Sequence, residues 1–107
     1  MNLKWLDLAE KNLDPEDEIQ KKYIGELDGE YGWLILSNKK LQFMHEKGFL
    51  HKTYDLVLDL KYDKIRKINH KSKQEVELVD VEGTKHNFKT GSIPVSIVEK
   101  ELKDLKS

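Results

Sequence analysis

The chain contains no cysteine, only two prolines, and no apolar run longer than four residues. Without a thiol there is no disulfide, no thiolate metal site and no cysteine nucleophile. The longest apolar run, from Trp33 to Leu36, is far shorter than a signal peptide or a membrane-spanning helix requires. We therefore expect a soluble, cytoplasmic protein that is at most peripheral to a membrane.

Arginine is also scarce, because Arg66 is the only one in the 107 residues. The formal net charge is −1, yet residues 39–73 contain 10 basic and 4 acidic side chains. Clustered cations attract phosphates and anionic lipids, so this segment contains a candidate basic face. Its members are Lys39, Lys40, Lys64, Arg66 and Lys67. The simpler interpretation, which we favour, is that lysines and glutamates solvate the outer faces of strands. The scarcity of arginine argues against sequence-specific nucleic-acid binding.

The apolar residues that are present suffice for one folded domain. Leu, Ile, Val and Phe number 31, which is about 29% of the chain and above the roughly 20% below which charged chains stay disordered. A chain of this length forms a single modest core. We expect residues 1–13 to form an amphipathic helix and residues 14–107 to form one folding unit.

Helical periodicity occurs at both ends of the chain. Residues 2–13 place apolar side chains on one face of a helix of about three turns, which Pro15 ends. Pro94 suits the start of a second helix, in which apolar residues recur at spacings of three, four and three over residues 95–105.

Between the helices, short alternating stretches are separated by turn residues, which predicts an all-β region. The alternation from Tyr54 to Leu60 predicts a strand with one buried face, and the run from Trp33 to Leu36 predicts a central strand. The predicted strands are 23–27, 33–36, 41–45, 54–60, 65–69, 75–81 and 86–88. The predicted core residues are Trp33, Leu36, Leu41, Phe43, Leu56, Leu58 and Val98.

Two stretches carry a resemblance to a known family. Residues 32–43, Gly-Trp-Leu-Ile-Leu-Ser-Asn-Lys-Lys-Leu-Gln-Phe, are similar to a Gly-x-Leu-x-Leu-Thr-Asn-Lys-Arg-Leu-x-Phe hairpin, with Ser for Thr and Lys for Arg. Residues 13–19, Leu-Asp-Pro-Glu-Asp-Glu-Ile, resemble a Leu-x-x-x-Glu-x-Ile opening. Residues 58–68 and 83–88 add weaker similarities. These motifs are those of GRAM and bacterial PH-like domains, within the pleckstrin-homology superfold.

The resemblance spans roughly residues 13–105 and implies a mainly β (α+β) fold. It implies a single PH-like barrel of about seven antiparallel strands, capped by a C-terminal helix, with an additional N-terminal helix. PH domains that grip phosphoinositides carry cations in their first hairpin loop, whereas residues 28–32 contain two carboxylates and no cation. Phosphate would be repelled there. Folds of this kind host lipid binding, peptide binding and scaffolding alike.

No motif predicts catalysis. The sequence contains no nucleophile elbow, no phosphate-binding glycine loop and no zinc-protease motif. The histidines lie in or beside predicted strands and turns, at no spacing that a metal site requires. They are His45, His51, His70 and His86. We expect no enzyme activity, no cofactor and no metal site.

Residues 47–52, Lys-Gly-Phe-Leu-His-Lys, form the candidate interaction loop. Phe49 and Leu50 can enter a bilayer interface while Lys47, His51 and Lys52 meet anionic headgroups, with about 1 kcal/mol per cation. The alternative, which we favour slightly, is that the apolar pair folds back as a small cluster on the body of the domain.

The expected function is therefore that of a non-catalytic interaction module. It binds an unknown protein partner or, weakly, an anionic lipid surface, and no specific nucleic acid. The alternative is a self-associating structural domain with no small-molecule ligand, a homo-oligomer in which Trp5, Leu8 or another exposed apolar face contacts a second copy.

Overall fold

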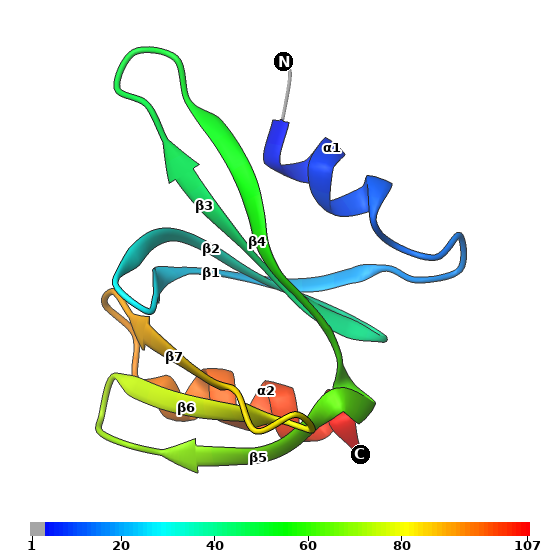
Figure 1. Ribbon diagram of the computed structural model, residues 1–107, viewed down its shortest axis with the longest axis vertical. Helices are drawn as coiled ribbons and strands as arrows, with labels where there is room; N and C mark the ends of the chain where they lie inside the picture. Colours follow the sequence, from blue (N-terminus) through cyan, green and yellow to red (C-terminus); the bar gives the residue numbers. More distant parts are fainter. Residues whose placement is uncertain (1–3) are drawn as a thin grey trace.

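The computed structural model describes residues 4–107, and it contains seven strands and two α-helices (Figure 1). The elements are α1 (Lys4–Lys11), β1 (Ile19–Leu27), β2 (Glu30–Ser37), β3 (Lys40–Lys47), β4 (Thr53–Lys61), the 3-10 turn η1 (Tyr62–Lys64), β5 (Ile65–His70), β6 (Glu75–Asp80), β7 (Lys85–Thr90) and α2 (Val95–Lys106). The predicted N-terminal helix is confirmed over Lys4–Lys11, and its predicted first residues lie outside the described part of the chain. Neither helix has the length and hydropathy needed to span a membrane, within residues 4–107.

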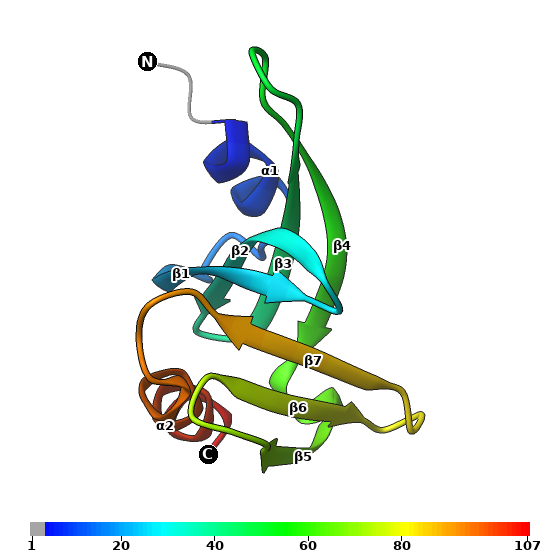
Figure 2. The same ribbon diagram turned by 90° about the vertical axis from the view of Figure 1, so that its left-hand side faces the viewer.

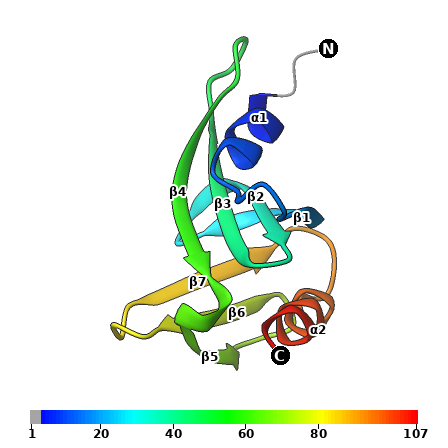
Figure 3. The ribbon, with the colours of Figure 1, turned by 90° about the vertical axis from the view of Figure 1, so that its right-hand side faces the viewer.

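All seven strands belong to one antiparallel sheet with the order β4-β3-β2-β1-β7-β6-β5. The sheet bends so that β1 to β4 and β5 to β7 form two halves, which η1 joins at their outer strands (Figure 2). The two helices lie at opposite ends of the molecule, α1 beside β3 and β4 and α2 beside β5 and β6 (Figure 3). The predicted fold class is thus confirmed: mainly β, with seven antiparallel strands, a C-terminal helix and an additional N-terminal helix.

The predicted loop over residues 28–32 is wrong, because β2 begins at Glu30. Asp28 and Gly29 alone make the reversal, with φ values of 50° and 89°. A two-residue turn with positive φ at both positions matches the twist of the strands that it joins, so pairing extends to its edge. The Asp28 carboxylate accepts a hydrogen bond from the Asn87 backbone N–H at 3.0 Å, which ties this turn to β7.

The larger core lies between the two halves of the sheet and is closed by α2. Phe43 and Phe88 meet edge to face at its centre, with ring centroids 6.2 Å apart. From α2, Val98 and Leu102 are buried in this core. The apolar spacing of residues 95–105 therefore does what amphipathic helix periodicity predicts: one face packs against the sheet and the other is solvated. We call this cluster the inner core.

A second cluster lies on the opposite face of β2 and β3, beneath α1, and we call it the outer cluster. Ala9 of α1, Ile35 and Met44 are fully buried in it. Partly buried residues surround them. These are Trp5, Leu8, Ile19, Trp33, Tyr54 and Leu56. The predicted central position of β2 is confirmed, because Leu34 and Leu36 contact the inner core while Ile35 contacts the outer cluster.

The prediction of one buried face for the strand over residues 54–60 is wrong. Tyr54 and Leu56 pack in the outer cluster, whereas Leu58 and Leu60 pack against the inner core. The cause is a β-bulge: Phe43 pairs with Leu58 and Met44 with Leu56, so Val57 is an extra residue. One extra residue inverts the side-chain phase.

Three of the seven predicted core residues are only half-buried. Trp33 and Leu56 belong to the rim of the outer cluster, and Leu58 lies at the edge of the inner core on the outermost strand. Leu36, Leu41, Phe43 and Val98 are confirmed as fully buried.

Candidate functional site

The candidate interaction loop lies at the tip of the β3–β4 hairpin, which projects beyond the rest of the sheet (Figure 1). Phe49 is 91% exposed and Leu50 is 82% exposed, the two most exposed large apolar side chains of the described chain. The interpretation that they fold back as a small cluster is therefore wrong. Neither side chain belongs to the inner core or to the outer cluster, so the pair meets solvent.

The tip has a backbone that only glycine can adopt at one position. Gly48 has a φ of 95°, and a Cβ there would lie 2.1 Å from the His51 carbonyl oxygen. A side chain at this position would have to open the loop. The shape that presents Phe49 and Leu50 thus requires glycine at position 48.

The cations of the loop are drawn toward acidic side chains on the hairpin stem. Lys47 Nζ lies 2.6 Å from a carboxylate oxygen of Asp55, and Lys52 Nζ lies 3.3 Å from one of Glu46. Glu46 also accepts a hydrogen bond from the Tyr54 hydroxyl, and burial together with this carboxylate raises the pKa of Tyr54. The lysines and the carboxylates nearly cancel, so the tip is apolar without a strong net charge.

The candidate basic face is not one surface. Lys40 Nζ lies 3.0 Å from Asp59, and Lys39 Nζ lies 2.5 Å from Glu16 and 3.7 Å from Asp14. The bond to Glu16 raises the pKa of Lys39. Both lysines are therefore neutralised by residues from distant parts of the sequence.

The remaining members of that face lie elsewhere. Lys64 ends η1, while Arg66 and Lys67 are exposed on the edge strand β5. None of these three forms an ion pair within residues 4–107. The hollow that Lys39 shares with η1 is also lined by Asp14 and Asp63. The surface around it is therefore of mixed charge.

The turn between β2 and β3 is held by a buried hydrogen-bond network. Ser37 Oγ donates to an Asp17 carboxylate oxygen at 2.8 Å, and the Tyr62 hydroxyl donates to the Ser37 carbonyl at 2.6 Å. Burial raises the pKa of Tyr62. Asp17 and Ser37 come from the two stretches that carry the family resemblance, so those stretches meet as one structural unit. The network is satisfied internally and offers no free group for chemistry.

The histidines contact separate polar groups. His45 Nδ1 lies 2.9 Å from the Tyr31 carbonyl oxygen and 3.6 Å from a Glu30 carboxylate oxygen. His70 Nδ1 lies 2.6 Å from Glu99, and His86 Nε2 lies 3.1 Å from Asp80. The His86 contact, with the backbone N–H groups of Thr84 and Glu82, holds the pKa of Asp80 below its usual range. No three His, Asp or Glu side chains converge on a point that suits a metal ion in the described chain. His45 and His51 are separated by the exposed tip.

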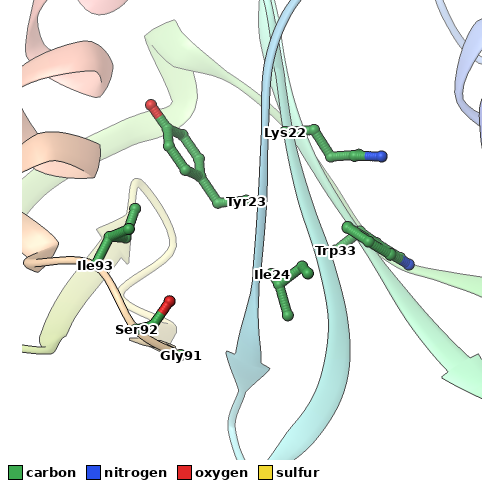
Figure 4. Close-up of a pocket in the computed structure, with 7 residues that line it drawn as sticks. All are labelled: Lys22, Tyr23, Ile24, Trp33, Gly91, Ser92 and Ile93. Carbon is green, nitrogen blue, oxygen red and sulfur yellow. The ribbon is translucent and has the colours of Figure 1, made fainter.

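A groove that the sequence did not indicate lies along β1 (Figure 4). Its lining is Lys22, Tyr23, Ile24, Trp33, Gly91, Ser92 and Ile93. Lys22 and Trp33 lie on one side of β1, and Tyr23 faces the loop that leads from β7 to α2 on the other. Burial and the nearby Glu101 carboxylate raise the pKa of Tyr23. Only the pairing of β1 with β7 reveals this groove, because nothing in the local sequence shows how far that pairing extends.

The sequence matches no family model and no curated protein. The function must therefore be argued from the surfaces described above. Two of these surfaces place exposed apolar side chains beside lysines. They are the hairpin tip, where the lysines pair with carboxylates, and the β1 groove, where Lys22 forms no ion pair within residues 4–107.

Proposed function

We propose that this protein is a non-catalytic interaction module that binds a protein partner through the tip of the β3–β4 hairpin. The observation that supports the proposal is the near-complete exposure of Phe49 and Leu50 on a projecting loop. Large apolar side chains side by side at such a position are a feature of interaction sites. The loop that presents them requires glycine at position 48, because a Cβ there would clash with the His51 carbonyl oxygen.

The magnitude of the apolar contact favours a protein pocket over a lipid surface. Full burial of Phe49 and Leu50 contributes about 1.5–3 kcal/mol each, whereas millimolar affinity already corresponds to about 4 kcal/mol. The tip alone therefore binds weakly, and a useful affinity needs further contacts along the stem. A protein pocket can provide them.

Weak binding to an anionic membrane is the second candidate, favoured by the position of Lys47, His51 and Lys52 around the apolar pair. The acidic partners of both lysines reduce this attraction, since Asp55 and Glu46 must approach the same surface. Such binding should disappear at physiological salt.

Self-association is the third candidate, but the structure excludes the contact surface that the sequence suggested for it. Trp5 and Leu8, which the sequence offered for a dimer contact, pack in the outer cluster of their own chain. A dimer would have to use other exposed apolar residues, such as Phe49 and Leu50 themselves.

The experiment places a photo-crosslinking amino acid at position 49 and irradiates cells of the native source. Crosslinked proteins are then identified by mass spectrometry. We expect a defined adduct with another protein. A second chain carries the crosslinking amino acid at position 49 together with Leu50→Ser, and this chain should not form the adduct. A probe at Ile97, which is 50% exposed and lies on α2, far from the hairpin tip, serves as the control.

Three results would direct the interpretation elsewhere. An adduct of the chain with itself, together with a concentration-dependent mass in light scattering, would favour self-association. Salt-sensitive sedimentation with anionic vesicles, lost on Phe49→Ser with Leu50→Ser, would favour the membrane. The same adducts at positions 49 and 97 would contradict the proposed site.

A further inference from the structure

The strand β1 is paired unevenly along its two edges. It pairs with β2 from Ile19 to Leu27, but with β7 only over Gly25–Leu27. Beyond Thr90 the chain leaves β7 and turns toward α2, so the first part of β1 has no strand on this side within the described residues (Figure 4). A strand edge of this kind presents backbone N–H and C=O groups that another chain can pair with.

The phase of the pairing shows which residue faces the open edge. The Asp28 N–H donates to the Asn87 carbonyl at 2.9 Å, so its backbone groups point toward β7. Residues two apart direct these groups to the same side. Lys22 therefore presents its N–H and C=O at the open edge, whereas those of Tyr23 point toward β2.

The surface beside this edge is a groove that suits side chains of an added strand. Ile24 is 45% exposed, and Tyr23 and Ile93 line the opposite wall. A second hollow continues around the loop, sharing Ser92 and Ile93 with the first. An added strand would place alternate side chains against the groove and toward Lys22.

The charged side chains that line this region are lysines, and the Glu101 carboxylate near Tyr23 is not part of the lining. Lys22 Nζ lies 4.0 Å from the Trp5 ring centroid and 4.3 Å from that of Trp33, and no carboxylate of residues 4–107 approaches it within 4.0 Å. Lys73 lines the second hollow, and neither hollow is lined by Asp or Glu. A cation held against two indoles without a counter-ion is positioned for an acidic side chain.

We infer that the open edge of β1 at Lys22 is a docking site for an extended segment of a partner protein in which acidic and apolar residues alternate. The segment adds a strand to β1, its apolar side chains contact Tyr23 and Ile93, and its carboxylates face Lys22. This mode of recognition obtains affinity from backbone hydrogen bonds and specificity from alternate side chains. It uses none of the residues of the hairpin tip.

A second copy of the chain fits this edge poorly. In a symmetric dimer the β1 edges would pair with each other, and Lys21 and Lys22 would approach the same residues of the other copy. Like charges placed opposite each other across paired strands are destabilising. The charge of the edge therefore selects an acidic partner over a copy of the chain.

The test is a titration of the full chain, labelled with nitrogen-15, with two peptides of about eight residues. One alternates glutamate with valine, and the other alternates lysine with valine. We expect the acidic peptide to shift the amide signals of Lys22, Ile24 and Ser92 below about 1 mM, and to bind about tenfold more tightly than the basic one. Absence of these shifts, or equal binding of both peptides, would overturn the inference.

Variants separate the backbone contribution from the charge contribution. Lys22→Glu should weaken acidic-peptide binding about tenfold, while Lys21→Glu, whose backbone faces β2, should change it less than about twofold. Lys22→Pro removes the free N–H and should abolish binding, provided its spectrum remains that of the folded chain. If Lys22→Pro does not fold, Lys22→Glu still tests the inference, because an unchanged affinity of Lys22→Glu for the acidic peptide would contradict the proposed site.

Two controls separate this edge from the hairpin tip and from self-association. Phe49→Ser with Leu50→Ser should leave peptide binding unchanged, so failure of this inference and failure of the proposed function give different results. Light scattering without peptide should show a monomer, because pairing of two β1 edges would give a dimer. A dimer that Lys22→Glu strengthens would overturn the choice of occupant.

Discussion

The inner core and the outer cluster differ in how completely each one is closed. The inner core is enclosed by both halves of the sheet and by α2, and its centre is an edge-to-face contact between Phe43 and Phe88. The outer cluster has a single cover, α1, which is eight residues long, and most of its members are half-buried. Thus β2 and β3 contribute to two hydrophobic clusters of unequal quality, one on each face.

Polar groups show the same contrast. Both buried side-chain atoms that lack a hydrogen-bond partner in the described chain, Trp33 Nε1 and Gln42 Oε1, belong to residues near the outer cluster. Gln42 reaches α1 only through a long bond of 3.3 Å from Nε2 to the Ala9 carbonyl. Unpaired buried groups lower stability. We therefore expect α1 to separate from the sheet before the inner core opens.

The largest loss of stability should come from truncating two adjacent residues of β3, one in each cluster. Phe43→Ala should destabilise the protein by about 3–5 kcal/mol, because it leaves a cavity in the inner core, which the two halves of the sheet and α2 enclose. Met44→Ala, also fully buried, should cost nearer to 2 kcal/mol, since α1 can settle into the space. Urea unfolding at equilibrium measures both. A larger loss for Met44→Ala would contradict the ranking.

Removing the main contact of α1 should have a smaller effect. Trp5 stacks on Trp33 with centroids 6.3 Å apart, and Lys22 lies over both rings. Trp5→Ala should cost about 1–2 kcal/mol, the sum of this stacking and partial burial. Hydrogen exchange should quicken in α1 and leave Leu34 and Leu41 protected. Faster exchange at Leu34 and Leu41 would show that the two clusters unfold together.

One substitution should strengthen the outer cluster. Gln42→Met keeps the side-chain length and removes the unpartnered oxygen, so we expect a gain of up to about 1 kcal/mol. Thermal unfolding should show a higher midpoint. The matched control is Gln74→Met, because that glutamine is exposed and its side chain makes only a long bond of 3.4 Å to the Gly91 carbonyl, so its substitution should change little. A lower midpoint for Gln42→Met would indicate that its bond to Ala9 outweighs the unpaired atom.

The smallest expected difference concerns acid. The pKa of Asp80 on β6 is lowered in the folded chain by His86 and by two backbone N–H groups, from an ordinary value of 3.8. Its contribution to stability is therefore complete above about pH 4 and is lost as the pH falls through 3.8 and the folded pKa. Glu77, on the same strand, has a pKa lowered chiefly by Asn69.

We expect acid to weaken the part of the sheet formed by β5 to β7 through the loss of this contribution. Urea midpoints measured between pH 2.5 and pH 6 should fall less in Asp80→Asn than in the natural chain, since the variant lacks this titrating group. Asp104→Asn, at an exposed position of α2, is the control. Identical pH profiles for the natural chain and Asp80→Asn would contradict the prediction, because they would mean that the pKa of Asp80 is the same in the folded and unfolded chains.

The hairpin tip shows how far sequence reasoning reaches into the candidate site. Lys47 to Lys52 was identifiable from the unusual Phe49-Leu50 pair between cations, but not the exposure of that pair. Exposure depends on how far β3 and β4 project beyond the body, and that is set by where the other strands end. The ion pairs of Lys39 and Lys40 were equally unpredictable, because Glu16 and Asp59 lie far from them in sequence.

The two helices and the approximate positions of the seven strands follow from the amino-acid sequence alone, because side-chain periodicity acts over a few neighbours. The point where a strand begins does not, as the start of β2 at Glu30 shows. Two features depend instead on how the whole chain packs. Val57 is a bulge residue, and β1 pairs with β7 over just three residues. An unbroken alternation cannot reveal the bulge, since the phase of a strand is defined by its partner. The open edge at Lys22 has the same origin: pairing between distant segments is chosen by the packing of the whole sheet.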